Sequence, residues 1–236
     1  MLLSYLKALE IDVWLPRDRP RVGSESPAGV EPISAASDAD LRSAGSGRGW
    51  AELEAAVRDC NLCPLHATRT QAVFGVGDRT AQWMVIGEAP GMEEDRKGEP
   101  FVGRAGQLLN AMLKSVGLAR EQVFIANILK SRPPNNRDPR PEEVRACLPY
   151  LQRQIELVNP RLILCVGRIA AQTLLQSSEP IGKLRGAVHR IFSDRPMVVT
   201  YHPAYLLRSP AEKRKAWADL TLALRTFRRL GGEIAS

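Results

Sequence analysis

Residues 83–91 read WMVIGEAPG, and this stretch decides the fold class. Its first five residues, Trp83–Gly87, form the kind of apolar run that is typical of a strand buried on both faces. The glycine-proline turn that follows, Gly87–Gly91, ends the strand and lets backbone amides approach a ligand. A strand that is buried on both faces needs helices on both sides, so the stretch predicts an α/β protein.

Similar apolar runs recur along the chain, separated by segments with helical spacing. Further strands are expected at Val123–Asn127, Leu162–Val166 and Met197–Thr200. Helices are expected at Ala105–Val116, at Glu142–Val158 with a break or restart at Pro149, at Gly167–Leu175, and after a capping box at Ser209–Glu212. The alternation predicts a three-layer α/β/α domain with a central, mainly parallel four-stranded sheet.

The first 48 residues differ in composition from the rest. Residues 1–14 form a short apolar peptide, which we interpret as a docking motif for another protein. Residues 15–48 are rich in Pro, Ser, Gly and charge and cannot bury a core, so they are expected to be a disordered linker. One folded domain is expected to span residues 49–236.

Composition and charge narrow the class of partner. Lys and Arg number 33 against 26 Asp and Glu, a net charge of +7, which favours nucleic acid as a partner, although a generically basic protein is the alternative. No apolar run approaches the roughly 18 residues of a membrane span. The N-terminus, with Glu10 and Asp12, makes a poor signal peptide. We therefore expect a cytoplasmic protein with no membrane partner, and a monomer.

Three loops follow the carboxyl ends of predicted strands, the edge at which open parallel sheets bind ligands. The first contains Gly87–Gly91 and, further on, Phe101 between a proline and a valine-glycine pair. Phe101 is either a core residue or a platform on which a base stacks. In the second loop, Asn127–Arg137, the amide of Asn127 either caps a turn or reads the edge of a pyrimidine.

The third loop, His202–Arg208, follows the last predicted strand. A single histidine is more often structural than catalytic, and both roles stay open for His202. Leu206 and Leu207 either pack under the next helix or, if they are exposed, wedge into a ligand.

Together the loop motifs resemble those of the family 4 (iron–sulfur) uracil-DNA glycosylases. GEAPG (87–91), PFVGRAGQLLN (100–110), NILKSRPPNNR (127–137) and HPAYLLR (202–208) occur in the family's order and spacing. The resemblance implies the fold of that family and hydrolysis of the N-glycosidic bond of flipped-out deoxyuridine in DNA, which releases uracil and leaves an abasic site for base excision repair. The alternative is a non-catalytic binder of uracil-containing or single-stranded DNA.

The resemblance also implies a role for the matching residues. Phe101 would stack on the flipped uracil, and Asn127 would hydrogen-bond its Watson–Crick edge and so reject cytosine. His202 would stabilise the negative charge that develops on uracil O2.

Three neighbouring residues, Gly87, Glu88 and Ala89, would shape the pocket. Family 1 relatives have an aspartate that positions the water where this chain has Ala89. Either Glu88 or backbone groups alone would therefore hold the water.

The same resemblance implies a DNA-binding rim. Leu206 and Leu207 would fill the gap left by the flipped base. Basic side chains in or beside the motif loops are expected to contact phosphates, so binding should weaken with salt; they are Lys130, Arg132, Arg137 and Arg208. The apolar N-terminal peptide would bind a repair or replication protein.

Members of this family hold a four-iron four-sulfur cluster on four cysteines. The resemblance implies Cys60 and Cys63, which form a C-x-x-C pair, and Cys147 as ligands. The position of the fourth cysteine is occupied by Ser131, so an iron would be open or bound by serine. Cys165 is a possible substitute but is expected to be a buried structural cysteine within a strand. The cluster is expected to be structural, because hydrolysis needs no electron transfer.

Two further classes compete with this interpretation. A glycosylase that stays covalently bound to the abasic product carries a histidine in a basic loop after the second motif, but residues 132–140 contain none. A zinc-stabilised α/β domain of another function would require the motif match to be accidental.

Overall fold

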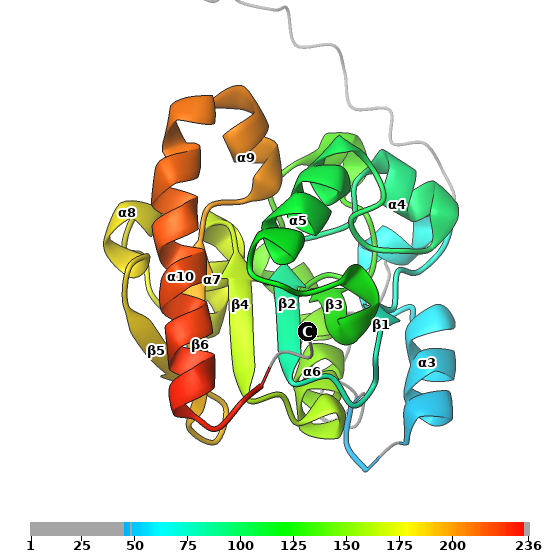
Figure 1. Ribbon diagram of the computed structural model, residues 1–236. Coiled ribbons are helices and arrows are strands. Elements are labelled where there is room, and N and C mark those ends of the chain that lie inside the picture. The colour runs from blue at the N-terminus through cyan, green and yellow to red at the C-terminus, as the bar shows by residue number, and fades with distance from the viewer. Residues whose placement is uncertain (1–44, 48, 234–236) are drawn as a thin grey trace, which may run out of the picture. The chain divides into compact units, whose positions relative to one another are not determined.

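Six strands form one sheet within the part of the chain that the computed structural model describes, residues 45–47 and 49–233 (Figure 1). They are β1 (Val76–Gly77), β2 (Trp83–Gly87), β3 (Val123–Asn127), β4 (Leu162–Val166), β5 (Val188–Ile191) and β6 (Arg195–Thr200), in the order β1-β3-β2-β4-β6-β5. The four inner strands are parallel, and β1 and β5 are antiparallel strands at the two edges. The predicted docking peptide, residues 1–14, and most of the predicted linker lie outside the described residues.

The parallel four-stranded centre of the sheet is confirmed. The bounds of β2, β3 and β4 match the predicted strands, and β6 begins two residues before the predicted start at Met197. The two edge strands were not predicted, because β1 has only two residues and only one residue of β5 is buried. Neither strand has the apolar run that identifies a buried strand.

Helices cover both faces of the sheet. They are α3 (Trp50–Arg58), α4 (Met92–Lys97), α5 (Arg104–Ser115), α6 (Pro141–Val158), α7 (Arg168–Leu175), α8 (Ile181–Leu184), α9 (Pro203–Arg208) and α10 (Lys213–Arg229). Short 3-10 turns lie at Pro64–Ala67, Arg120–Gln122, Pro134–Asn136 and Pro210–Glu212. No helix among the described residues is both long and apolar enough to cross a membrane.

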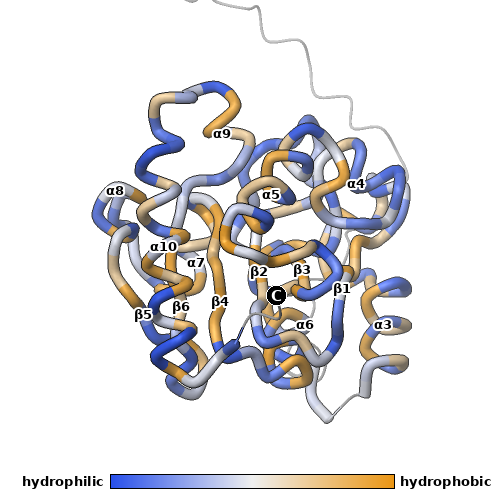
Figure 2. Tube along the Cα trace, in the orientation of Figure 1, coloured by the Kyte–Doolittle hydropathy of each residue, from blue (hydrophilic) through white to orange (hydrophobic). Residues whose placement is uncertain are grey.

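The core is divided by the sheet into two apolar clusters. Along β2, Met84 and Ile86 pack with buried residues of α3, α6 and α7, while Trp83 and Val85 pack with α5, α9 and α10. Successive side chains of a strand point to opposite faces, so an uninterrupted apolar run serves both layers. Figure 2 shows the inner strands and the facing sides of the helices as the apolar centre of this arrangement. The three-layer architecture is therefore confirmed.

Helix α6 differs from its prediction, because it continues through Pro149 without a break. A proline inside a helix removes one backbone hydrogen bond, at a cost of about 3 kcal/mol. Cys147 and Leu151 are buried against the sheet on either side of Pro149. Packing on both sides of the proline holds the two halves of the helix in line.

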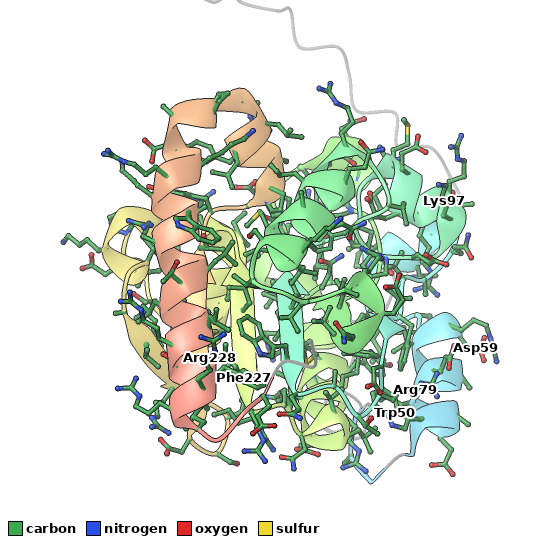
Figure 3. All side chains as sticks on the ribbon, in the orientation of Figure 1. Trp50, Asp59, Arg79, Lys97, Phe227 and Arg228 are labelled. Atoms are coloured by element: carbon green, nitrogen blue, oxygen red, sulfur yellow. The ribbon has the colours of Figure 1, made fainter. Side chains whose placement is uncertain are left out.

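The C-terminal region also differs in detail. The segment predicted as a loop forms α9, which Pro203 begins, and α10 starts at Lys213 after a 3-10 turn. The Ser209 side chain makes no capping hydrogen bond. On α10, Phe227 is buried and Arg228 is exposed, as expected for a helix that covers one face of a sheet (Figure 3).

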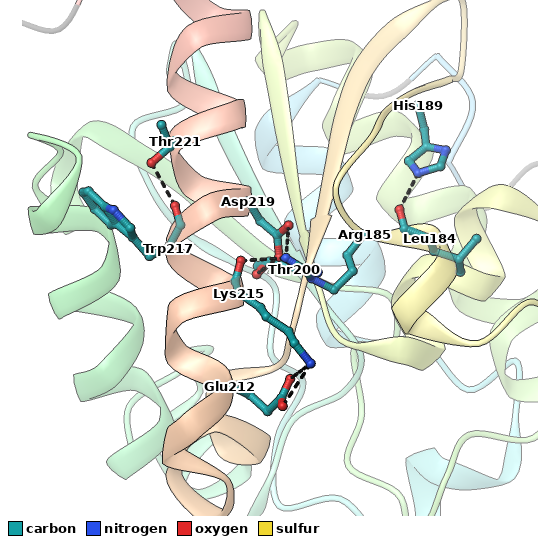
Figure 4. A network of polar contacts seen from close by, with 9 residues as sticks. All are labelled: Leu184, Arg185, His189, Thr200, Glu212, Lys215, Trp217, Asp219 and Thr221. Atoms are coloured by element: carbon teal, nitrogen blue, oxygen red, sulfur yellow. Dashed lines mark hydrogen bonds and ion pairs between the residues drawn. The ribbon is translucent and has the colours of Figure 1, made fainter.

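A buried polar network ties the end of β6 to α10. Asp219 is fully buried; its carboxylate pairs with the Arg185 guanidinium at 2.8 Å and accepts a hydrogen bond from Thr200 Oγ1 at 2.9 Å (Figure 4). The Arg185 guanidinium also lies over the ring of Tyr201. These contacts fix the two residues that precede His202.

Candidate active site

A pocket of about 430 Å³ opens at the carboxyl end of the parallel strands. All three predicted loops contribute to its lining, which includes Glu88, Ala89, Phe101, Asn127, His202 and Arg208. Strands β2 and β3 are neighbours in the sheet, with Gly87 paired to Asn127, whereas β6 lies beyond β4. The fold thus brings together residues that are more than one hundred positions apart in the sequence.

Phe101 lines the pocket with its ring stacked near that of His202. The ring centroids are 5.6 Å apart and the rings are inclined by 30°. The backbone of Phe101 has a φ of 54°, a left-handed conformation that bulky residues rarely adopt. Gly106 makes this possible, because any side chain there would collide with the Phe101 carbonyl.

Asn127 ends β3 and is 2% exposed. Among the described residues, its Oδ1 has no hydrogen-bond partner although it is buried. A methyl group on Gly87 would lie 2.7 Å from Phe101 Cζ and closer still to Asn127 Oδ1. Glycine at position 87 therefore gives the floor of the pocket the space for both side chains, and the amide of Asn127 is available to a ligand.

His202 lies just before α9 and has a defined tautomer. Its Nδ1 accepts a hydrogen bond from the Ala204 N–H at 3.1 Å, so the neutral ring carries its proton on Nε2. Burial, with a smaller effect of Arg208, lowers the pKa of His202 to about 4. The ring is therefore a neutral hydrogen-bond donor at neutral pH.

Glu88 follows β2 and lines the same pocket. The pKa of its carboxyl group is raised to about 7, mainly by burial. The negative charge of Asp138 also raises this pKa, and its effect is larger than the opposite effect of Arg168. A carboxyl group that titrates near neutral pH can take up a proton during a reaction.

The sequence motifs did not identify Glu94 as a site residue. Its carboxylate lines the pocket and accepts hydrogen bonds from the backbone N–H groups of Gly91, Val102 and Gly103 at 3.0–3.3 Å. Glu94 therefore ties the turn after β2 to the loop that carries Phe101. A glutamate three residues after Gly91 matches a capping box, which was the available signal.

Lys130 does not reach the surface, which contradicts its prediction as a phosphate contact. The side chain is 1% exposed, and its Nζ donates to the Asn127 carbonyl and to Gln154 Oε1, both at 2.7 Å. Burial lowers the pKa of Lys130 to about 7. Through its bond to the Asn127 carbonyl, Lys130 stabilises the end of β3.

Leu206 also differs from its prediction as a wedge, because it is 1% exposed and packs in the core with α5 and α10. Leu207 is half-buried, and Tyr205, which was not singled out, is exposed and lines the pocket. The Tyr205 ring lies 5.1 Å from that of Tyr201. Of the two leucines, only Leu207 is partly exposed.

Three of the predicted basic residues do lie at or near the pocket mouth. Arg137 and Arg208 line the pocket, and Arg208 is exposed. Arg132 is half-buried, with its Nε donating to Asn136 Oδ1 at 2.7 Å. The Arg137 guanidinium is held in place by two hydrogen bonds to the buried carboxylate of Glu143.

The predicted cysteine ligands gather away from this pocket. The interaction with Cys147 lowers the pKa of Cys63. The interaction with Cys63, burial and a smaller effect of Cys60 raise the pKa of Cys147. The Lys130 backbone N–H donates to Cys147 Sγ at 3.4 Å. Within residues 45–47 and 49–233, no three His, Cys, Asp or Glu side chains form a group that could hold a single metal ion. Cys165 is buried within β4.

Ser131, which occupies the position of the fourth cysteine, offers an oxygen rather than a sulfur donor. It is 3% exposed, and its Oγ accepts a hydrogen bond from Arg69 Nη1 at 2.9 Å. Arg69 Nη2 donates to the Cys60 carbonyl, also at 2.9 Å. The three thiols fit the donor chemistry of an iron–sulfur cluster, and the region supplies no fourth thiol.

Comparison with known proteins finds a superfamily model and several type-4 enzymes that resemble this chain. Residues 74–221 match the model of the uracil DNA glycosylase superfamily. The chain is 46% identical to the type-4 uracil-DNA glycosylase of Archaeoglobus fulgidus over 69% of this chain and 85% of that protein. It is 44% identical to the type-4 enzyme of Pyrobaculum aerophilum, over 72% of this chain and 91% of the relative. It is also 44% identical to the type-4 enzyme of Thermotoga maritima, over 65% of this chain and 80% of that protein.

Proposed function

This chain belongs to the uracil DNA glycosylase superfamily and is a type-4 uracil-DNA glycosylase, an enzyme that excises uracil from DNA, and from this premise we propose how its residues act. The observation that carries the proposal is the stacked pair of Phe101 and His202 beside the amide oxygen of Asn127, which has no partner within the described part of the chain. A flat base fits against Phe101 by stacking. Asn127 then accepts a hydrogen bond from uracil N3–H with its oxygen and donates one to O4 with its amide group.

In the reaction the bond between uracil N1 and the sugar C1′ breaks, and the electron pair leaves with the base. Negative charge spreads to uracil O2, where the Nε2 proton of His202 forms a hydrogen bond that strengthens as the charge grows. Water adds its oxygen to C1′ and loses a proton. Glu88 is proposed to take that proton, since its carboxyl group titrates near neutral pH within the same pocket.

This role for Glu88 predicts a pH dependence. Because its pKa is raised to about 7, the basic carboxylate is lost progressively as the pH falls below 7. The single-turnover rate of uracil release should therefore level off above pH 7 and fall on the acid side by about tenfold in total, to the rate that remains without a base. In Glu88→Gln the acid limb should disappear, and the plateau should lie about tenfold lower, because turn amides still hold the water.

The same measurement separates an enzyme from a binder. A non-catalytic binder would retain uracil-containing DNA and release no free base at any pH. If Glu88→Gln kept the acid limb of the wild-type profile, the limb would belong to another group and Glu88 would lose its proposed role. Glu93→Gln, a neighbouring carboxylate in an exposed ion pair with Arg96, serves as the matched control and should leave the profile unchanged.

The rim of the pocket is proposed to contact DNA. Arg208 and Arg137 line the pocket and are proposed to contact the phosphates that flank a flipped nucleotide; Arg132 lies in the same loop as Arg137. Leu207, half-buried on α9, is the proposed wedge that fills the space of the extruded base. Lys130 and Leu206 take no part in this surface, because both are buried.

We also propose that Cys60, Cys63 and Cys147 hold the four-iron four-sulfur cluster implied by the family. The interaction of Cys63 with Cys147 supports the assignment, as does Arg69, which bonds to both Ser131 Oγ and the Cys60 carbonyl. The cluster would tie the segment before β1 to α6 and to the loop after β3, and its role would be structural. It supplies no chemistry to the glycosidic bond.

Metal analysis tests the cluster directly. Anaerobically purified protein is expected to contain about four iron atoms and a similar amount of acid-labile sulfide per chain. Ser131→Cys should keep this content and lose iron more slowly in air, because a fourth thiolate replaces a weaker oxygen donor. Cys165→Ala, a matched cysteine within the sheet, should retain its iron, whereas Cys147→Ser should lose most of it. A wild-type protein free of iron would contradict the assignment.

A further inference from the structure

We propose that Arg120 is a positioning residue, which holds Phe101 in the orientation required for base stacking. Arg120 begins the 3-10 turn Arg120–Gln122 before β3 and is half-buried outside the lining of the pocket. The inference rests on the proposed role of Phe101 and extends it by naming the side chain that fixes its backbone.

The Arg120 guanidinium binds two consecutive carbonyl groups of the Phe101 loop. Nη2 donates to the Pro100 carbonyl at 2.6 Å, and Nη1 donates to the Phe101 carbonyl at 3.3 Å. Nη1 also lies 3.2 Å from Asn110 Oδ1 on α5, so the guanidinium itself is held in place. Hydrogen bonds from a charged donor are stronger than neutral ones, and a planar donor group fixes the direction of both carbonyls.

Phe101 needs such support because its backbone conformation is unfavourable. With φ at 54°, it persists only where the surroundings enforce it. Three features act on this residue: Gly106 leaves room for its carbonyl, Glu94 holds the next N–H groups, and Arg120 binds the carbonyls. A return of φ to the ordinary range would rotate the ring away from His202 and from the base.

Arg120→Met tests the inference, because it removes the donors and keeps a long side chain. The single-turnover rate on uracil-containing DNA should fall roughly tenfold, since small misplacements of reacting groups have effects of this order or larger. The enzyme concentration at half-saturation should stay within about twofold, because phosphate contacts do not involve Phe101. Arg120→Lys should recover part of the rate, as an ammonium group can still donate to the Pro100 carbonyl.

The matched control is Arg161→Met. Arg161 Nη1 donates to the Leu230 carbonyl at 2.7 Å, outside the pocket, so this variant loses the same kind of contact. Its rate should equal that of the wild type. All assays are run below the thermal transition of each variant, and if Arg120→Met does not fold, Arg120→Lys carries the test with a smaller loss of rate.

A double-mutant cycle with Phe101→Ala shows whether Arg120 acts through Phe101. Without the ring there is nothing to orient, so Arg120→Met should lower the rate of Phe101→Ala by less than about twofold. An equal loss in both backgrounds, or no loss from Arg120→Met in the wild type, would overturn the inference. If Phe101→Ala alone left the rate unchanged, the stacking role itself would fail, and that result is distinct from the first two.

Discussion

Asn127→Ala is expected to excise uracil about 100-fold more slowly than the wild type. The side chain is proposed to form two hydrogen bonds with the base. The loss of both, at about 1.4 kcal/mol each, amounts to roughly 2.8 kcal/mol, which corresponds to this factor. The amide is buried at the end of β3, and its oxygen has no hydrogen-bond partner among the described residues, so it is available to the base. Single-turnover release of uracil with enzyme in excess gives the rate directly.

Asn127→Asp is expected to change the preference of the site for uracil over cytosine. A carboxylate has two acceptors and no donor, so it opposes uracil O4 and matches the N4 amino group of cytosine. We expect the ratio of uracil to cytosine excision to fall, even if cytosine remains a poor substrate. Gln71→Ala, an amide outside the pocket whose Nε2 bonds to the Arg96 carbonyl, is the matched control. Wild-type uracil excision by Asn127→Ala would show that the base is read by other groups.

The central strands could be predicted from sequence because each is a run of five or six residues with no exposed position. Such runs suit one environment only, a strand covered on both faces, so the bounds of β2, β3 and β4 follow from the residues themselves. The continuity of α6 could not be predicted. Whether a helix survives Pro149 depends on packing against the sheet, and that packing is absent from local sequence.

Adjacent residues in the motif loops show where sequence reasoning ends. Leu206 and Leu207 appear equivalent in sequence, but on the short helix α9 they point in directions about 100° apart, so only Leu206 faces the core. Lys130 is buried because Gln154, twenty-four residues later, supplies an acceptor for it. These outcomes depend on the tertiary fold.

Glu94 and Arg120 illustrate a second limit. Both act on the backbone of the Phe101 loop through hydrogen bonds, and neither belongs to a catalytic pattern of side chains. Groups that contact a substrate can be inferred from their chemistry. Groups that set the backbone of those residues become visible only in three dimensions.

His202→Ala is expected to lower the single-turnover rate by about 10²- to 10³-fold, which is the usual effect of removing one donor to a developing anion. The donor is oriented in advance, because the Ala204 N–H occupies Nδ1 and leaves the proton on Nε2. His202→Gln, which replaces the imidazole N–H with an amide N–H donor, should retain more activity than His202→Ala. A rate unchanged in His202→Ala would remove the residue from the mechanism.

The pH profile distinguishes the proposed roles of His202 and Glu88. The pKa of His202 is lowered to about 4, so the ring stays neutral from pH 5 upward and its own protonation cannot produce an acid limb near neutrality. We assign the expected limb near pH 7 to Glu88, whose pKa is raised. His202→Ala should therefore lower the whole profile and leave its shape unchanged, while Glu88→Gln should change the shape. If removing His202 abolished the limb near pH 7, the imidazole would be titrating there, and the neutral donor would have to be replaced by an imidazolium ion that pairs with the departing uracil anion.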